Sequence, residues 1–407
     1  MWLKLLDPAL RSLIREGRLV LHLPDGSVRH YGAGPEPPVT VRIADAALIG
    51  RLVRNPALAV GEGYMEGSLT VDGDDLHGLI GLGLRNHAAR NGAWWHRAGE
   101  AARNWLRVLR QFNPAGRSRA NVAHHYDLSG ALYDLFLDAD RQYSCAYFAR
   151  PGMTLEEAQA AKKAHVASKL LLRPGMRVLD IGCGWGGMAL TLARDHGVRV
   201  LGVTLSEEQQ RVACARAEAA GLADRVAFRL ADYRMVEGEF DRIVSVGMFE
   251  HVGVPHYRAY FRTLRDRLSP DGVALVHTIG RAAPPGSTNP WIARYIFPGG
   301  YVPALSEVVA AVEREGLWQT DIEIWRLHYA ETLRHWHARF EANLDRARAL
   351  YDDRFCRMWR FYLVACEQTF RLHRQCVFQL QLARRRDAVP LTRDYLYRGA
   401  ALAQAAE

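Results

Sequence analysis

Several features that mark particular classes of protein are missing from this chain of 407 residues. No stretch of about 20 apolar residues could span a bilayer, and residues Met1–Pro8 are too short and interrupted for a secretory signal peptide. The six cysteines form no C-x-x-C pair and no framework typical of secreted proteins. We therefore expect reduced thiols in a cytoplasmic protein, with no zinc site.

Lysine is also scarce, since it provides only four of the 53 basic side chains. These 53 face 44 acidic residues, which gives a formal net charge of +9. Such a surface attracts anions, whether nucleic acids, nucleotides or acidic lipids, and charge alone does not choose among them. Arginine suits phosphate because its planar fork binds two oxygens, although codon bias explains the same composition. Length and a hydrophobic fraction of 49% indicate a globular protein of about two domains.

The segment from Arg85 to Arg119 is strongly basic, with eight arginines and a single acid, Glu100. Six apolar residues spaced 4-3-4-3-4 predict one stripe of a helix: Trp94, Ala98, Ala101, Trp105, Val108 and Phe112. Such a helix suits an anionic membrane surface, and it suits a core-facing helix or an interdomain connector equally well. We therefore expect an N-terminal domain over 1–112, a linker over 113–122 and a catalytic domain over 123–407.

Short apolar runs such as Val39–Ile43, separated by turn signals, predict a small mixed α/β region at the N-terminus. Further on, strand-length runs alternate with helical segments. The expected strands are Arg177–Ile181, Val198–Thr204, Val226–Leu230, Phe240–Val246, Val273–Ile279 and Ile322–Leu327. The expected helices are Leu155–Leu172, Met188–Asp195, Glu207–Ala220 and Tyr257–Leu268, followed by aromatic-rich helices through about residue 385. The alternation predicts an α/β fold with a doubly wound, mainly parallel sheet.

A glycine-rich loop, Asp180-Ile181-Gly182-Cys183-Gly184-Trp185-Gly186-Gly187, follows the first strand of this sheet. Its glycines allow a sharp turn and a close approach of the backbone to a ligand. A dinucleotide site would place an acid at the tip of the second strand, about 20 residues later. Here that strand ends in Gly202–Ser206 without an acid. The pattern disfavours NAD and predicts S-adenosylmethionine, which has no pyrophosphate.

Four further strings accompany this loop. They are His124–Leu128 with Tyr143–Tyr147, Thr204–Ser206 with Gln209, Met248–Gly253, and His277–Gly280. Together they resemble the cyclopropane-fatty-acyl-phospholipid synthase family and its mycolic acid cyclopropane synthase relatives, over about residues 120–385. The N-terminal region resembles the phospholipid-acting branch more loosely, at Gly61–Gly67. The resemblance implies a class I S-adenosylmethionine-dependent methyltransferase, Rossmann-like, with a smaller N-terminal α/β domain.

The resemblance implies a set of residues around S-adenosylmethionine. They are Tyr143, Ser144, Asp180, Gly182, Gly184, Gly186, Thr204, Leu205, Ser206, Gln209, Asp232 and Tyr233. Independently, these residues lie at or just after expected strand ends, where open α/β sheets bind ligands.

In the family, a cis double bond attacks the sulfonium methyl, and the resulting carbocation closes to a ring when the new methyl loses a proton. A base must take that proton in a dry pocket. The resemblance implies a bicarbonate ion as this base, held by Cys145, Glu250, His277, Ile279 and Tyr329. Cys366 matches a cysteine proposed as catalytic in the family. No histidine or lysine pattern beside it indicates a lowered thiol pKa, so a buried small side chain is its default interpretation.

Each of these residues also has a structural explanation. Glu250 could cap the following helix, His277 could be an ordinary core histidine, and Cys145 could contribute only its backbone. The aromatic residues of the helices after Tyr329 could line an acyl-chain tunnel, although at helical spacing most belong to a core.

We expect a cyclopropane-fatty-acyl-phospholipid synthase at the inner face of the membrane, binding anionic phospholipid and no nucleic acid. The family's tendency implies a homodimer. One alternative is a family member that makes a methyl-branched or methylene chain. Another is a nucleic-acid methyltransferase, suggested by the charge and by Asn289-Pro290-Trp291, although this string follows the fifth expected strand and not the fourth. A third is a lipid-binding protein without catalysis.

Overall fold

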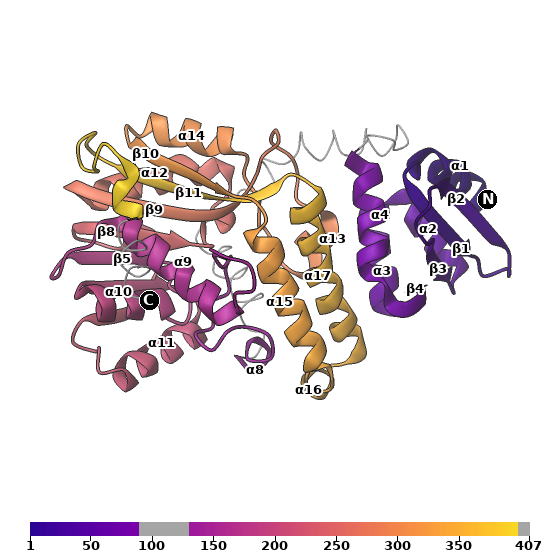
Figure 1. Ribbon diagram of the computed structural model, residues 1–407, viewed down its shortest axis with the longest axis horizontal. Helices are drawn as coiled ribbons and strands as arrows, with labels where there is room; N and C mark the ends of the chain where they lie inside the picture. Colours follow the sequence, from indigo (N-terminus) through magenta and orange to yellow (C-terminus); the bar gives the residue numbers. More distant parts are fainter. Residues whose placement is uncertain (89–129, 398–407) are drawn as a thin grey trace. The chain divides into compact units, whose positions relative to one another are not determined.

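The computed structural model describes residues 1–88 and 130–397 (Figure 1). Its described residues divide into two compact units. The N-terminal unit comprises 1–88, 286–298 and 329–375, and the seven-stranded unit comprises 130–285, 299–328 and 376–397. Most of the basic segment and the whole of the expected linker at 113–122 lie outside the described residues. Both units are discontinuous in sequence, which differs from the contiguous division expected above.

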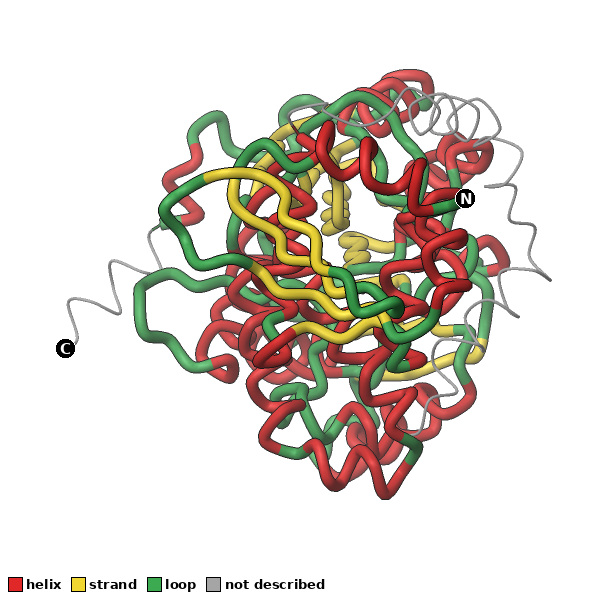
Figure 2. Tube along the Cα trace, turned by 90° about the vertical axis from the view of Figure 1, so that its right-hand side faces the viewer, coloured by secondary structure: helices red, strands yellow, loops and turns green. Residues whose placement is uncertain are grey.

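The N-terminal unit contains a four-stranded sheet with the order β2-β1-β3-β4. Its strands are β1 (Gly17–His22), β2 (Val28–Ala33), β3 (Val39–Ile43) and β4 (Leu69–Val71). The helices of this region are α1 (Leu3–Leu13), α2 (Ala46–Arg54), α3 (Pro56–Glu66) and α4 (Leu76–Ala88). Strand β1 pairs antiparallel with β2 and parallel with β3. This confirms the mixed α/β region (helices red and strands yellow in Figure 2).

Helices from much later in the sequence complete this unit. They are α13 (Pro290–Tyr295), α15 (His328–Ala342, except its first residue), α16 (Leu344–Leu350) and α17 (Asp353–Leu372). The indole Nε1 of Trp291 lies 3.2 Å from Met65 Sδ, and its ring meets Phe361 edge-on at 4.7 Å. A Cβ on Gly61 would lie 2.5 Å from the same indole, so α3 needs glycine there. These contacts explain why segments 226 residues apart share one unit.

The string Asn289-Pro290-Trp291 has a structural role in this unit. Asn289 is the N-cap of α13, and its Oδ1 accepts the N–H of Trp291 at 2.8 Å. Pro290 occupies the first turn, where its missing N–H costs nothing. The string is therefore a helix start, which removes the one motif that suggested a nucleic-acid methyltransferase.

The seven-stranded unit has a sheet with the order β10-β11-β9-β8-β5-β6-β7. The strands are β5 (Arg177–Ile181), β6 (Arg199–Thr204), β7 (Val226–Leu230), β8 (Phe240–Val246), β9 (Leu268–Arg281), β10 (Trp318–Trp325) and β11 (Gln375–Ala383). Strands β9, β8, β5, β6 and β7 pair in parallel, whereas β10 and β11 are antiparallel. The predicted doubly wound, mainly parallel sheet is confirmed.

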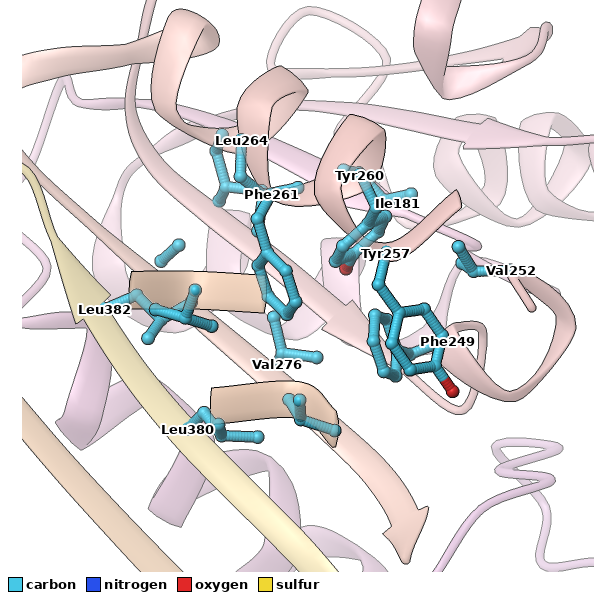
Figure 3. Close-up of a cluster of buried hydrophobic side chains, with 14 of the residues drawn as sticks. Ile181, Phe249, Val252, Tyr257, Tyr260, Phe261, Leu264, Val276, Leu380 and Leu382 are labelled. Atoms are coloured by element: carbon cyan, nitrogen blue, oxygen red, sulfur yellow. The ribbon is translucent and has the colours of Figure 1, made fainter. Parts of the chain in front are cut away.

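Two helical layers cover this sheet because its central strands are apolar on both faces. On one face, Val178 packs in a cluster with α9 (Leu155–Leu170), α10 (Gly187–His196) and α11 (Glu207–Ala219). On the other, Leu179 and Ile181 pack with α12 (Tyr257–Arg267) and α14 (Leu305–Arg314), in the cluster of Figure 3. The short helix α8 (Gly130–Tyr133) precedes these layers in the chain. None of the described helices is long and apolar enough to cross a membrane.

The expectation of helices through about residue 385 is wrong after Leu372, where the chain forms β11. This strand is buried at nearly every position, including Gln379 and Gln381. A strand that is buried on both faces shows no alternation of polar and apolar residues, so its sequence does not distinguish it from a buried helix.

Gly280 tests the contact between β9 and β11. A Cβ at Gly280 would collide with the ring of Phe378 on the neighbouring strand. Gly280→Ala should therefore destabilise the protein by about 1–3 kcal/mol in urea unfolding followed by circular dichroism. The control is Gly83→Ala in α4, where nothing lies within 4 Å of the added Cβ, and it should be neutral or stabilising. Equal stability of the two variants would contradict this packing.

Candidate active site

A pocket lies at the carboxyl ends of β5, β6 and β8, where the strand order reverses on the two sides of β5. Open α/β sheets bind ligands at such a point. The pocket brings together ten of the twelve residues expected around the cofactor: Tyr143, Ser144, Asp180, Gly182, Gly184, Thr204, Leu205, Gln209, Asp232 and Tyr233. Gly186 and Ser206 do not line it.

The glycine loop gives the pocket a floor of bare backbone. Gly182 and Gly184 have φ values of +79° and +54°, in the left-handed region that favours glycine. A Cβ on Gly182 would lie 2.8 Å from Met248 Cβ, and one on Gly187 would collide with Gln142. Gly186 instead serves packing, because its Cβ would lie 2.7 Å from the Phe228 ring.

The second loop is held by side chains at the start of α11. Ser206 is the N-cap of this helix, and its hydroxyl accepts the N–H of Gln209 at 3.3 Å. Thr204 Oγ1 donates to Gln209 Oε1 at 2.8 Å. The N–H of Ser206 also donates to Thr204 Oγ1 at 3.2 Å, so Ser206 positions two lining residues without reaching the pocket itself.

Asp180 is the buried acid of the pocket. Its Oδ2 atom has no hydrogen-bond partner among the described residues, and burial raises the pKa of its carboxyl to about 7. A carboxylate in this position favours a cationic ligand group. The glycine floor and this unpaired oxygen fit S-adenosylmethionine, which carries a sulfonium and an ammonium. After β7, Asp232 Oδ1 accepts from Arg234 Nε at 2.8 Å, so its charge is already paired.

Glu250 lies on the short helix η3 (Phe249–His251) after β8. Its Oε1 accepts the backbone N–H of Ile279 at 2.6 Å, and its Oε2 is buried without a partner among the described residues. Burial raises the pKa of this carboxyl to about 7. The side chain bonds to β9, whereas the two helices that follow, η4 (Val254–His256) and α12, have Gly253 and His256 as their N-caps. The helix-cap explanation for Glu250 is therefore wrong.

His277 stands on β9, two residues before Ile279 and on the same face of the strand. It is paired in register with Val246 at the end of β8. Gln379 Nε2 lies 3.0 Å from His277 Nδ1, and Gln379 Oε1 has no partner in the described part of the chain. Burial lowers the pKa of His277 well below its ordinary value, so the imidazole is neutral. Glu250, His277 and Ile279 thus occupy one edge of the sheet.

The remaining expected catalytic residues lie elsewhere. Cys145 is buried in the seven-stranded unit, and its thiol donates to the carbonyl of Ala146 at 3.4 Å. Tyr329 belongs to the N-terminal unit and packs against Trp336 and Phe370. Cys366, on α17 of that unit, is partly buried, and lost hydration raises its thiol pKa to about 12. Such a thiol is protonated at neutral pH, which argues against a thiolate nucleophile.

Seven of the eight aromatic residues expected to form either a core or an acyl-chain tunnel are buried, and four of them have almost no exposed surface. Trp336, Phe340 and Trp359 belong to the N-terminal unit, and Phe378 lies on β11. Their burial fits the core interpretation, which one expects for aromatics at helical spacing.

Several pocket or neighbouring residues were not predicted individually. His251 lines the pocket, and burial lowers its pKa to about 4. Gln142 and Arg234 also line it. These three flank predicted residues in the sequence, so the motif strings could have suggested them. Gln379, which bonds to His277 from 102 positions away, had no local signal.

The buried carboxyl of Glu250 makes stability depend on pH. Its pKa is about 7 in the folded chain and near 4.5 when exposed, so its ionisation costs stability progressively as pH rises between these values. Glu250→Gln should therefore be more stable than wild type at pH 8, by at most about 3 kcal/mol, and no more stable at pH 4.5. Thermal unfolding at both pH values measures this. The control is Glu237→Gln at an exposed position, and a difference from wild type that is the same at both pH values would refute the assignment.

Comparison with known proteins places the whole chain in context. The family model described as mycolic acid cyclopropane synthetase matches residues 115–380. A model of a domain of unknown function matches residues 10–90. A probable fatty acid methyltransferase of Pseudomonas putida is 37% identical over 406 residues, covering 97% of this chain and 99% of its own. The cyclopropane-fatty-acyl-phospholipid synthase of Escherichia coli K12 is 38% identical over 353 residues, covering 85% and 88%.

The fold comparison agrees. The crystal structure of mycolic acid cyclopropane synthase CmaA1 complexed with SAH and CTAB has 36% sequence identity and a TM-score of 0.62. It covers 67% of this chain and 99% of that one. The expected class I methyltransferase fold and the S-adenosylmethionine cofactor are thereby confirmed. The chain belongs to the mycolic acid cyclopropane synthetase family and is an S-adenosylmethionine-dependent methyltransferase that acts on lipids.

Proposed function

We propose that the protein is a cyclopropane-fatty-acyl-phospholipid synthase that uses bicarbonate as general base. The observation that carries this proposal is the buried Glu250 carboxyl, which bonds to Ile279 on the strand that also carries His277. Neither these three residues nor Cys145 line the cofactor pocket, but Met248 and His251, on either side of Glu250 in the sequence, do. The name of the Escherichia coli relative, which covers most of the chain, supports it.

Bound S-adenosylmethionine would supply a sulfonium methyl that the lipid double bond attacks, and the resulting carbocation closes to a ring when the new methyl loses a proton. The chain must then exclude water and hold a base for this proton. No side chain of the group is an ordinary exposed base. His277 is neutral and buried, and burial raises the pKa of the Glu250 carboxyl to about 7.

The unpaired Oε2 atom of Glu250 is the feature that suits a bicarbonate ion. Glu250 Oε2 is a buried oxygen that needs a hydrogen-bond donor, and the O–H of bicarbonate is one. The neutral imidazole of His277, whose Nδ1 lies 3.0 Å from the amide of Gln379, offers its other ring nitrogen to a second bicarbonate oxygen, while the N–H of Ile279 stays with Glu250 Oε1. Bicarbonate would supply the basic oxygen there, while Glu250 orients it. Cys145 and Tyr329 would complete the set on the family pattern.

The alternative product is a methyl-branched or methylene-bearing chain from the same carbocation. The name of the Pseudomonas putida relative, a probable fatty acid methyltransferase, leaves it open. In the alternative, a hydride shifts to the cationic carbon before a proton is lost, which leaves a double bond, and a saturated methyl branch would further need a hydride donor. A base fixed by Glu250 beside the cofactor pocket favours removal of a proton from the new methyl group before that shift, and hence the ring.

The acyl substrate also implies a membrane partner. Double bonds of phospholipids lie within a bilayer, so the enzyme must dock on the inner face of the membrane to reach them. The net charge of +9 suits an anionic lipid surface, and the basic segment Arg85–Arg119 would supply much of the attraction. A homodimer, expected from the family, is part of the same proposal.

The product test uses purified protein, S-adenosylmethionine and vesicles of cis-monounsaturated phosphatidylglycerol, with and without added bicarbonate. Gas chromatography and mass spectrometry of the released fatty acids should show a cyclopropane acid, one methylene heavier and without an alkene. Glu250→Gln should lower its formation about 100-fold or more while S-adenosylhomocysteine still binds. A methylene-bearing or unsaturated methyl-branched product would select the alternative, and wild-type turnover of the variant would remove Glu250 from the mechanism.

Membrane docking is tested by charge reversal of Arg103, Arg107 and Arg110. Each basic residue near an anionic surface contributes about 1 kcal/mol, so reversal should weaken cosedimentation with phosphatidylglycerol vesicles at least tenfold at low salt. The control reverses three exposed arginines of the seven-stranded unit, Arg199, Arg211 and Arg229, for the same change in net charge. Equal losses of vesicle binding in the two triple variants would show a general attraction between the protein and the anionic surface. Unchanged vesicle binding in both variants would reject docking through this segment.

A further inference from the structure

A fully buried lysine lies behind the wall of the cofactor pocket. Lys162, on α9, has no exposed surface, and its Nζ donates to Gln142 Oε1 at 2.5 Å and to Ser144 Oγ at 2.9 Å. Both acceptors line the pocket. One turn earlier on α9, buried Gln159 donates from Nε2 to the carbonyls of Ser144 at 2.9 Å and Gln142 at 3.2 Å. Helix α9 thus makes four hydrogen bonds to one short stretch of the wall.

This stretch of the wall depends on those bonds. Residues 142–147 form neither helix nor strand, so no ladder of backbone hydrogen bonds holds them. Gln142 is fixed further by Asp138 Oδ1, which accepts its N–H at 2.8 Å, and by Asp140 Oδ2, which accepts from its Nε2 at 3.0 Å. Asp140 in turn pairs with Lys163 at 2.5 Å and with Arg216.

The charge of Lys162 reaches further than its hydrogen bonds. The ionisable groups that interact with it are Asp138, Asp140, Cys145, Lys163, Asp180 and His277. Burial lowers the pKa of Lys162 to about 8, so it is mainly protonated at neutral pH. Burial raises the pKa of Asp180, and the charge of Lys162 lowers it. The Oδ2 atom of Asp180 has no hydrogen-bond partner among the described residues, so it is available to a cationic group in the pocket. A buried ammonium costs free energy, whereas an apolar side chain would fill the same space without that cost.

We propose that Lys162 is a positioning residue for the bound cofactor. It holds Gln142 and Ser144 in the pocket wall through hydrogen bonds from its Nζ, and its positive charge favours the ionised form of the Asp180 carboxyl for the cationic cofactor. This inference depends on S-adenosylmethionine binding alone and not on which lipid product forms.

The same helix offers a matched control. Lys169 lies seven positions further on, also without exposed surface, but its Nζ pairs with Glu323 at 2.5 Å and Asp321 at 3.3 Å. Neither acid lines the pocket. Lys162→Met and Lys169→Met therefore remove equivalent buried charges from one helix, and only the first touches the pocket wall.

Binding of S-adenosylmethionine and S-adenosylhomocysteine by calorimetry tests the proposal, with thermal unfolding as the folding check. Lys162→Met should weaken S-adenosylhomocysteine binding about tenfold or more, and S-adenosylmethionine binding at least threefold beyond that, because only the latter carries the sulfonium charge. Lys169→Met should change both by less than twofold. Equal losses in the two variants, or unchanged binding in Lys162→Met, would overturn the positioning role.

The pH profile separates the charge from the hydrogen bonds. Wild-type binding of S-adenosylmethionine should weaken as pH falls through about 7, where Asp180 takes up a proton. Lys162→Met should shift this midpoint upward, and Gln159→Leu, which loosens the wall but keeps the charge, should not. If Lys162→Met does not fold, Lys162→Gln replaces it, since the amide retains donors and loses the charge. An unshifted midpoint in the folded lysine variant would refute the electrostatic part.

Discussion

The exclusion of water from ionisable side chains at the carboxyl ends of β5, β8 and β9 is the constraint on which the site depends. Burial brings the pKa of both Asp180 and Glu250 to about 7, and it keeps His277 neutral. Each of these groups opposes folding in its charged form. The apolar layers on both faces of the sheet offset this cost, since their side chains are almost completely buried. The same core that stabilises the fold therefore sets the protonation of the site.

The sequence predicts the central sheet well because its strands are short β-branched runs between glycine turns and helices. Strands β5, β7 and β8 have the expected bounds. It fails at β11, where both faces are buried and Gln379 and Gln381 interrupt the apolar pattern. The sequence also does not show which segments make up each of the two compact units. The contact of Trp291 with Met65 joins residues far apart in the chain, and no local pattern records it.

The site divides in the same way. Residues on the glycine loop and at the strand ends could be predicted, because backbone geometry gives them a local signature. The residues that fix these site residues through hydrogen bonds could not be predicted. Lys162 is one lysine in an unremarkable helical sequence, and only its distance to Gln142 reveals its place. Gly186 and Ser206 show the limit of motif transfer, since both belong to the motif and neither lines the pocket.

The discontinuity of the two units constrains how the chain can be divided. Beyond the N-terminal region the backbone passes between the units near residues 285, 298, 328 and 375. No single cut releases either unit as a continuous polypeptide. Removing residues 1–112 would leave Trp291 without the glycine-lined face of α3, and α17 would lose its partners α3 and α4. A shortened enzyme would therefore need new polar residues on α13 and α17, and a family member without the first domain must carry a different surface there.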